Sequence, residues 1–222
     1  MLGLNRDDSI TFNGTMGQED RYTLGGRVWG NIADTGLDFD LEGAYQFGEL
    51  GSADISAFMI ATEVGYRFEN WSGTPRLHVG AGYASGDDTA GGDVETFNHL
   101  FPLGHAYLGY IDTVGRQNAI DLNAGLTVKP LKKLTVRLTG HLFWRADTDD
   151  ALYDAGGAVV RAGALGNDRE IGSEIDLVLK YAFDRHLSTQ LGYSYFFAGD
   201  FINQSGADDD IGFFHMTVQF KF

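Results

Sequence analysis

The sequence predicts an all-β chain that folds as an antiparallel transmembrane β-barrel of about ten strands with long extracellular loops. Segments of about ten residues alternate apolar and polar side chains, and turns rich in Gly, Asp, Asn and Pro separate them. The 222-residue chain also lacks the run of about 18 apolar residues that a transmembrane helix needs. Residues 1–222 are therefore predicted to form a single outer-membrane β-barrel domain.

Four strands in the first half follow a predicted first strand at residues 9–16. In each of the four, apolar side chains recur mainly at every second position, and the opposite side carries most of the polar residues together with Trp29 and Met59. These strands, with their apolar sides, are 21–33 (Tyr22, Leu24, Val28, Ile32), 37–47 (Leu37, Phe39, Leu41, Tyr45, Phe47), 55–68 (Phe58, Ile60, Val64, Tyr66, Phe68) and 76–83 (Leu77, Val79, Tyr83).

The second half alternates more cleanly and supplies five further strands. They cover residues 120–129, 134–145, 175–183, 187–197 and 211–222. Residues 106–112 also resemble a strand, but counting them in the wall would put a long loop on the wrong side of the membrane. We assign them to a loop, which leaves ten strands, an even number of the kind that bacterial barrels prefer.

The last strand ends on an aromatic residue after an unbroken alternation. Phe214, Met216, Val218, Phe220 and Phe222 point to one side, and the intervening residues are polar. A closing strand with a terminal Phe is typical of barrels in the outer membrane of Gram-negative bacteria, where the assembly machinery reads it. Phe214, Phe220 and Phe222 are the predicted assembly signal, and the assembly machinery and membrane lipid are predicted partners.

Charged side chains are confined to the polar sides of these strands. A charge at the lipid midplane costs about 2–4 kcal/mol, so a bilayer would enforce this separation. A soluble antiparallel sandwich also alternates, but it gives no reason for aromatic residues to gather at the strand ends. The basic residues on the polar sides are Arg21, Arg27, Arg67, Arg76, Lys129, Arg137, Arg145, Lys180 and Lys221.

Loop lengths predict the orientation of the chain in the membrane. The short turns at 34–36, 130–133 and 184–186 are expected in the periplasm, with Phe222. The long segments 87–118, 147–171 and 198–209 are then extracellular. The chain begins without a basic and apolar signal peptide, so we expect a mature or truncated chain.

The lumen predicted by this arrangement is slightly basic, although the whole chain carries a net charge of -15. A basic interior favours the passage of anions, because charges that line a pore set its selectivity. The predicted substrate pathway comprises Arg21, Arg27, Arg67, Arg76, Lys129, Arg137, Arg145 and Lys180. An equally weighted alternative is a structural or adhesion barrel whose lumen is plugged by Arg–carboxylate pairs.

Other kinds of site have less support in the sequence. Acidic residues cluster in the long loops, beginning with Asp87, Asp88, Asp93 and Glu95, and could bind Ca²⁺. They do not match an EF-hand, and a solvated outer surface is the favoured interpretation, so we predict no metal or cofactor. The chain lacks Cys and the G-x-S-x-G and H-E-x-x-H motifs, so no enzyme activity and no nucleic-acid partner are expected. A lipid-modifying barrel enzyme that uses His141 or His215 is the third alternative.

Several ordered blocks from about Gly82 onward resemble the alginate export family of outer-membrane barrels. They include Gly86-Asp87-Asp88, the stretch from Thr96 to Pro102, Gly115-Arg116-Gln117-Asn118, Phe143-Trp144-Arg145-Ala146, and Tyr193 to Asp200. The resemblance implies an eighteen-stranded barrel that passes a polyuronate through an arginine-lined pore gated by loops. This chain then resembles the C-terminal ten strands of such a barrel, with Arg67, Arg76, Arg137, Arg145 and Lys180 in the pore and residues 87–118 as an extracellular lid.

Overall fold

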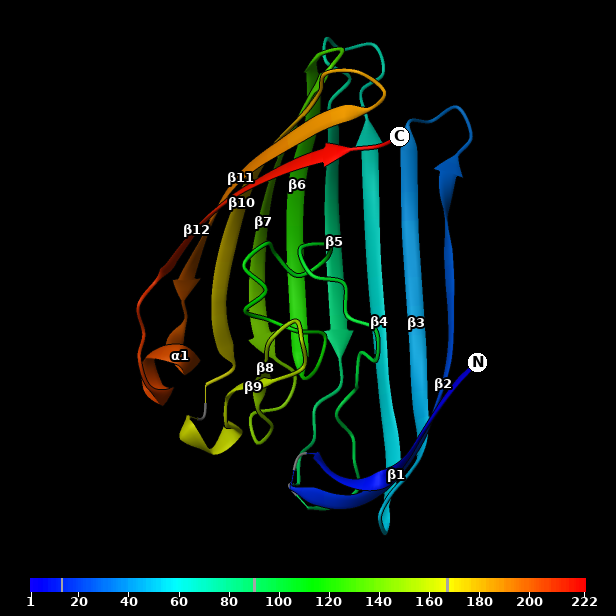
Figure 1. Cartoon of the computed structure of the whole chain (residues 1–222), viewed down its shortest axis with the longest axis vertical. Helices are drawn as coiled ribbons and strands as arrows, with labels where there is room; N and C mark the ends of the chain where they lie inside the picture. Colours follow the sequence, from blue (N-terminus) through cyan, green and yellow to red (C-terminus); the bar gives the residue numbers. More distant parts are fainter. Residues whose placement is uncertain (13, 90, 167) are drawn as a thin grey trace.

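Ten long strands form one antiparallel sheet, with each strand hydrogen-bonded to its neighbours (Figure 1). This computed structural model describes residues 1–12, 14–89, 91–166 and 168–222; residues 13, 90 and 167 of the predicted segments 9–16, 87–118 and 147–171 lie outside that description. The strands in spatial order are β1 (Leu2–Phe12), β2 (Thr15–Ile32), β3 (Leu37–Leu50), β4 (Ala53–Arg67), β5 (Arg76–Ala84), β6 (Ala119–Leu131), β7 (Leu134–Arg145), β10 (Glu170–Ala182), β11 (Leu187–Ala198) and β12 (Ile211–Phe220).

The predicted number of strands in the sheet is confirmed, whereas the predicted first strand is wrong. Residues 9–16 span the end of β1, the turn after it and the start of β2, where Phe12 pairs with Thr15. The polar run Asn5-Arg6-Asp7-Asp8 conceals the alternation of β1 in the sequence. Residues 106–112 are not part of any strand, as predicted.

The sheet is strongly curved but open. In the described residues β1 pairs only with β2, and β12 pairs only with β11. β1 also pairs with β2 only from Thr15 to Thr23, so the rest of β2 has a single neighbour, β3. The all-β antiparallel fold is thus confirmed, and closure of the sheet into a barrel stays a prediction.

The two faces of the sheet differ in polarity, as the alternation predicted. On the outer, convex face the apolar side chains are uncovered: Val28, Val79 and Val218 are 62%, 62% and 60% exposed. The inner, concave face carries the charged side chains and is partly covered by the chain itself. An apolar face left uncovered by protein over ten strands is expected to meet another apolar phase.

Aromatic pairs lie on the outer face toward both ends of the strands. At the end with the short turns, which we call the short-turn end, Tyr66 packs edge-on against Phe68 and Tyr181 against Phe183. Nearer the opposite, long-loop end, Tyr22 stacks on Phe47 and Phe58 on Tyr83. This arrangement is typical of the aromatic girdles that flank a lipid-facing band.

The remaining elements belong to the segments at the long-loop end. They are β8 (Leu152–Tyr153), β9 (Val159–Arg161), the 3-10 turn η1 (Gly163–Leu165) and α1 (Asp200–Ser205). Their apolar side chains pack with the ends of β7, β10 and β11 into a small core of Phe143, Leu152, Ile171, Phe196 and Phe201. Among the described residues, none of the helices is long and apolar enough to cross a membrane.

Candidate functional site: the polar inner face

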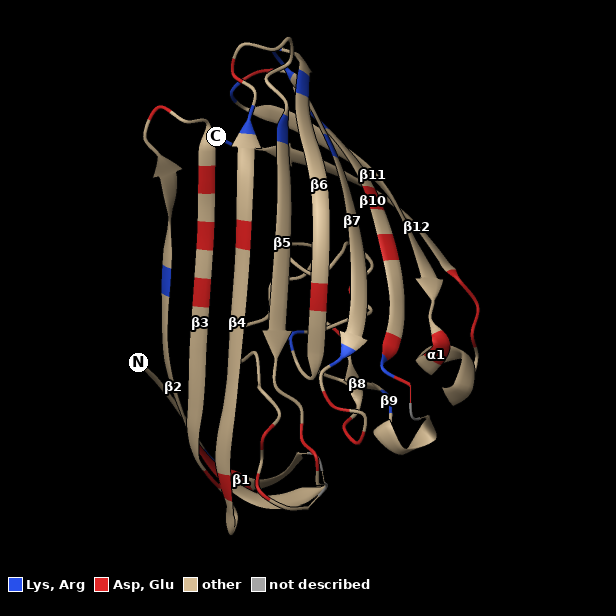
Figure 2. Ribbon diagram, turned by 180° about the vertical axis from the view of Figure 1, so that it is seen from behind, with Lys and Arg blue, Asp and Glu red and all other residues tan. Residues whose placement is uncertain are grey.

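Polar side chains from seven neighbouring strands, β2 to β7 and β10, converge on the middle of the inner face. Figure 2 shows acidic residues along β3, β4, β6 and β10, and Lys or Arg near the short-turn ends of β4, β5 and β6. A cavity of about 250 Å³ opens among these side chains. Its charged lining residues are Arg27, Asp40, Glu42, Glu63, Arg76, Arg116, Asp121, Arg137 and Asp176.

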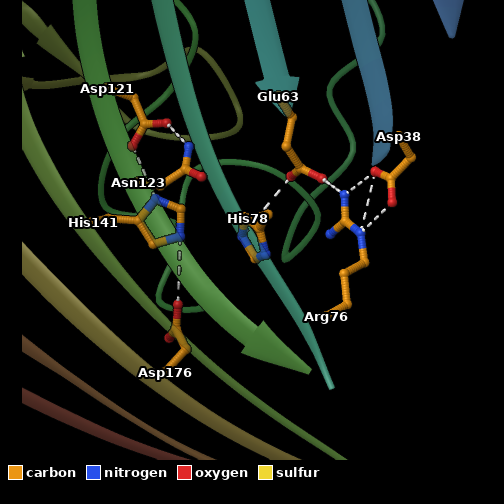
Figure 3. A network of polar contacts seen from close by, with 8 residues as sticks. All are labelled: Asp38, Glu63, Arg76, His78, Asp121, Asn123, His141 and Asp176. Atoms are coloured by element: carbon orange, nitrogen blue, oxygen red, sulfur yellow. Dashed lines mark hydrogen bonds and ion pairs between the residues drawn. The ribbon is translucent and has the colours of Figure 1, made fainter. Parts of the chain in front are cut away.

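Arg76 connects three adjacent strands on this face (Figure 3). Its guanidinium donates to Asp38 on β3, with Nε 2.9 Å from Oδ2, and its Nη2 lies 2.6 Å from Glu63 Oε1 on β4. The Arg76 side chain passes over Gly65 of β4, which pairs with Asp38 on β3 and with His78 on β5. A larger residue would block this path, because a Cβ at position 65 would lie 2.6 Å from Arg76 Nε. The charge of Arg76 is therefore shared by two carboxylates.

A second network joins β6, β7, β10 and β11. His141 Nδ1 lies 2.9 Å from Asp121 Oδ1, and its Nε2 is 3.8 Å from Asp176 Oδ2 (Figure 3). Asn123 donates to the other oxygen of Asp121, and the Ser194 hydroxyl donates to Asp176 rather than to His141. The hydroxyl–imidazole pair needed for a serine nucleophile is therefore not formed at Ser194.

The segment between β5 and β6, residues 85–118, turns back and lies against the inner face (Figure 1). Glu174 on β10 accepts hydrogen bonds from the backbone amides of Tyr110 and Ile111, at 2.6 and 3.0 Å. The positive φ of Gly109, 85°, turns the backbone beside the Glu174 carboxylate. Two successive amides therefore bind one carboxylate oxygen, and the tip of the segment is fixed to the sheet.

The Tyr110 side chain adds two further contacts to the wall. Its hydroxyl accepts a hydrogen bond of 2.6 Å from Arg137 Nη2, and its ring stacks on His215 of β12 at 4.9 Å between centroids. Closer to β3, Gln46 and Asn98 exchange two hydrogen bonds. Much of the described part of residues 87–118, which the resemblance implied to be an extracellular lid, lies within the curve of the sheet.

Comparison with known proteins identifies the family of the chain. The model of the alginate export family matches residues 2–210. The chain belongs to the alginate export family. Its similarity to the family thus extends well beyond the blocks after Gly82, to the N-terminal strands.

No curated protein matches this family member significantly. Among solved structures it is similar to the crystal structure of the COG4313 outer membrane channel from Pseudomonas putida F1. The two chains share 17% sequence identity with a TM-score of 0.45, and the similarity covers 89% of this chain and 69% of that one.

The predicted pathway residues of this alginate export family member have three different environments. Arg27, Arg76 and Arg137 lie at the cavity, but each binds a partner: Asp40, Asp38 with Glu63, and the Tyr110 hydroxyl. Arg67, Lys129 and Lys180 lie at the short-turn end of the inner face and make no ion pair within the described residues. Among the predicted pathway residues, those without a described ion pair or side-chain partner at the inner face therefore lie at that end.

Two of the predicted pathway residues are buried away from the cavity. Arg21 is fully buried, bonded to Glu19 and Gln46 at 2.7 and 2.8 Å. Arg145 is also fully buried, and its guanidinium donates to backbone carbonyls of the segment after β7 and stacks on Phe201. The alternation correctly placed both on the inner side of their strands, but it could not show that other segments cover them.

One cation at the cavity was missed by the sequence analysis. Arg116, in the segment after β5, lines both this cavity and a more apolar neighbouring one of about 410 Å³, and its guanidinium lies over the Tyr107 ring at 5.5 Å. Alternation assigns faces only within strands, so a basic residue in a loop gives no such signal. The block Gly115-Arg116-Gln117-Asn118, which resembles the family, was the available indication.

Proposed function

We propose that this member of the alginate export family forms the wall of an outer-membrane channel that passes an anionic polysaccharide such as alginate, or smaller anions. The family match over residues 2–210 carries the proposal. The apolar outer face and the polar inner face support it, because a membrane channel needs lipid on one side and water on the other. Family membership favours transport over enzymatic chemistry, and we propose a Gram-negative outer membrane as its location.

The proposed pathway runs along the inner face toward the short-turn end. There Arg67, Lys129 and Lys180 offer cationic groups to a passing carboxylate. Weak binding at several such positions lets a polyanion enter and still leave. The edges of the open sheet require hydrogen-bond partners in lipid, and we propose that further strands of a larger barrel supply them.

The measurement that tests this function is the reversal potential of the refolded chain in a planar bilayer under a salt gradient. An anion-selective current that mannuronate oligomers block is the expected result. A silent or unselective bilayer would mean either an incomplete wall or the second candidate, a structural barrel with a filled lumen. The specific observation behind that candidate is the paired interior, in which Arg27, Arg76 and Arg137 already have partners.

Charge reversal at the short-turn end is expected to reverse this selectivity. With Lys129→Glu and Lys180→Glu combined, two of the three unpaired cations at this end become anions, so permeation should shift from anions to cations. Arg161→Glu, on β9 outside the large sheet, is the matched control and should leave the reversal potential unchanged. Equal reversal potentials in the wild type, the double lysine variant and Arg161→Glu would refute a role for these lysines in selectivity.

A charge on the outer face is expected to impair membrane insertion. Leu177 of β10 points outward and is 40% exposed, and Leu177→Arg should cost about 2–4 kcal/mol in a bilayer if its position is near the midplane. Leu165→Arg, in η1, serves as the control because Leu165 is exposed outside the sheet. Unfolding free energies in lipid vesicles separate the cases; equal costs for both variants would mean that β10 does not face lipid.

A further inference from the structure

Three carboxylates of the segment between β5 and β6 meet at the long-loop end, where they line neither cavity. Asp87, Asp88 and Glu95 each place one carboxylate oxygen within 4.8 Å of the others. In the described part of the chain, none of these three carboxylates forms an ion pair with Lys, Arg or His. Their negative charges therefore have no protein cation beside them.

Asp87 provides an independent sign that a ligand is needed. Its side chain is 2% exposed, and one carboxylate oxygen, Oδ1, accepts the amide hydrogen of Thr89 at 2.9 Å. The other oxygen, Oδ2, is buried and has no hydrogen-bond partner among the described residues. Burial of a carboxylate oxygen without a donor is costly, and a bound cation would remove that cost.

The backbone around the three carboxylates is held firmly in place. The Asp87 amide and the Thr96 hydroxyl both donate to Asp150 Oδ2, at 3.1 and 2.6 Å. The Ser85 hydroxyl donates to the Glu95 carbonyl oxygen at 2.6 Å, which ties the two ends of the cluster together. Val94, next to Glu95, is in turn hydrogen-bonded to β4. Asp87 and Glu95 are thus brought together before any ligand binds.

We propose that Asp87, Asp88 and Glu95 form a Ca²⁺ site that fastens the start of the β5–β6 segment at the long-loop end. Ca²⁺ takes six to eight oxygen ligands in flexible geometry; three carboxylates can supply up to six, and water the remainder. Asp88 is exposed, so the ion can enter from solvent. Mg²⁺ binds more weakly here, because it demands near-octahedral geometry and gives up its water reluctantly.

Calorimetric titration of the refolded, EDTA-treated chain with CaCl₂ tests the site. The titration measures Ca²⁺ binding and not conduction, so its result does not depend on whether the protein is a channel. We expect saturable binding with a Kd of about 10⁻⁴–10⁻³ M, the range of extracellular Ca²⁺ modules. Asp87→Asn and Glu95→Gln should each weaken binding about tenfold or more. The matched control Asp208→Asn alters an exposed acidic run elsewhere and should bind as the wild type does.

Asp88→Asn tests the site in a chain that is expected to fold normally, because Asp88 is exposed and its replacement disturbs no core contact. Asp87→Asn and Glu95→Gln change less exposed residues and could weaken binding by disturbing the fold. Weaker binding in Asp88→Asn, in a chain with wild-type heat-modifiable mobility on gels, supports the site. Absence of saturable binding up to about 10 mM CaCl₂, beyond the range of known extracellular sites, overturns the proposal. Wild-type affinity in Asp87→Asn, Asp88→Asn and Glu95→Gln overturns it as well.

Discussion

Arg145→Ala is expected to lower the free energy of unfolding by about 3–5 kcal/mol, because each buried carbonyl group that loses its donor costs about 1–3 kcal/mol. The guanidinium lies at the centre of the segment between β7 and β10, where it donates to the carbonyl oxygens of Thr148, Asp150, Gly163, Gly166 and Asp168. It also lies over the Phe201 ring, 3.6 Å from the centroid. Without it, several buried carbonyl groups lose their donor at once.

Urea unfolding in lipid vesicles, followed by tryptophan fluorescence, measures this loss. Arg145→Lys should retain little of the stability, because a single ammonium group cannot reach carbonyls spread around a planar guanidinium. Arg67→Ala is the control, since Arg67 makes no side-chain ion pair in the described structure, and should change stability by less than about 0.5 kcal/mol. An Arg145→Ala protein as stable as Arg67→Ala would contradict the assigned role of Arg145.

Glu174→Ala is expected to release the tip of the β5–β6 segment from the sheet and raise the conductance of the channel. Glu174 is 2% exposed and accepts two backbone amide hydrogen bonds from Tyr110 and Ile111. A hydrogen bond contributes about 0.5–1.5 kcal/mol, so the loss of both amounts to as much as about 3 kcal/mol. A loss of about 3 kcal/mol shifts the ratio of docked to released segment roughly a hundredfold toward release.

Two measurements follow this release. Single-channel conductance should rise in Glu174→Ala and stay at the wild-type level in Glu170→Ala, which removes an exposed glutamate from the same strand. Amide hydrogen exchange at Tyr110 and Ile111 should also accelerate in Glu174→Ala alone, and this readout does not depend on conduction. Unchanged exchange would mean that other contacts hold the segment, such as the stacking of Tyr110 on His215.

The sheet was predictable from the sequence because its period-two pattern is local. β6 and β7 begin within one residue of the predicted strands, and β7 ends at Arg145 as predicted. β1 was misassigned because its polar side chains interrupt the pattern that identifies the other strands. Closure could not be tested by the same reasoning, since alternation specifies faces and says nothing about which strands meet across the opening.

The candidate site was only partly predictable, because its contacts join residues far apart in the chain. The alternation predicted that Arg76 and Arg137 face inward. It could not predict that Tyr110 would lie against Arg137 and Glu174, because residues 106–112 were assigned to a loop and alternation assigns faces only within the strands of the sheet. The expectation of a basic lumen was based on the strands alone. It took no account of the segment that covers the inner face, or of the carboxylates of Asp38 and Glu63 that pair with Arg76.

The bridge from Arg76 to Asp38 and Glu63 also has a mechanical meaning. Bending a sheet toward its inner face brings the inward side chains closer together, so a contact that crosses β3, β4 and β5 resists flattening. The bending stiffness of this part of the wall then depends on ion pairs that are partly open to water. Salt weakens such pairs, so ionic strength acts on the width of the enclosed space as well as on the ions within it.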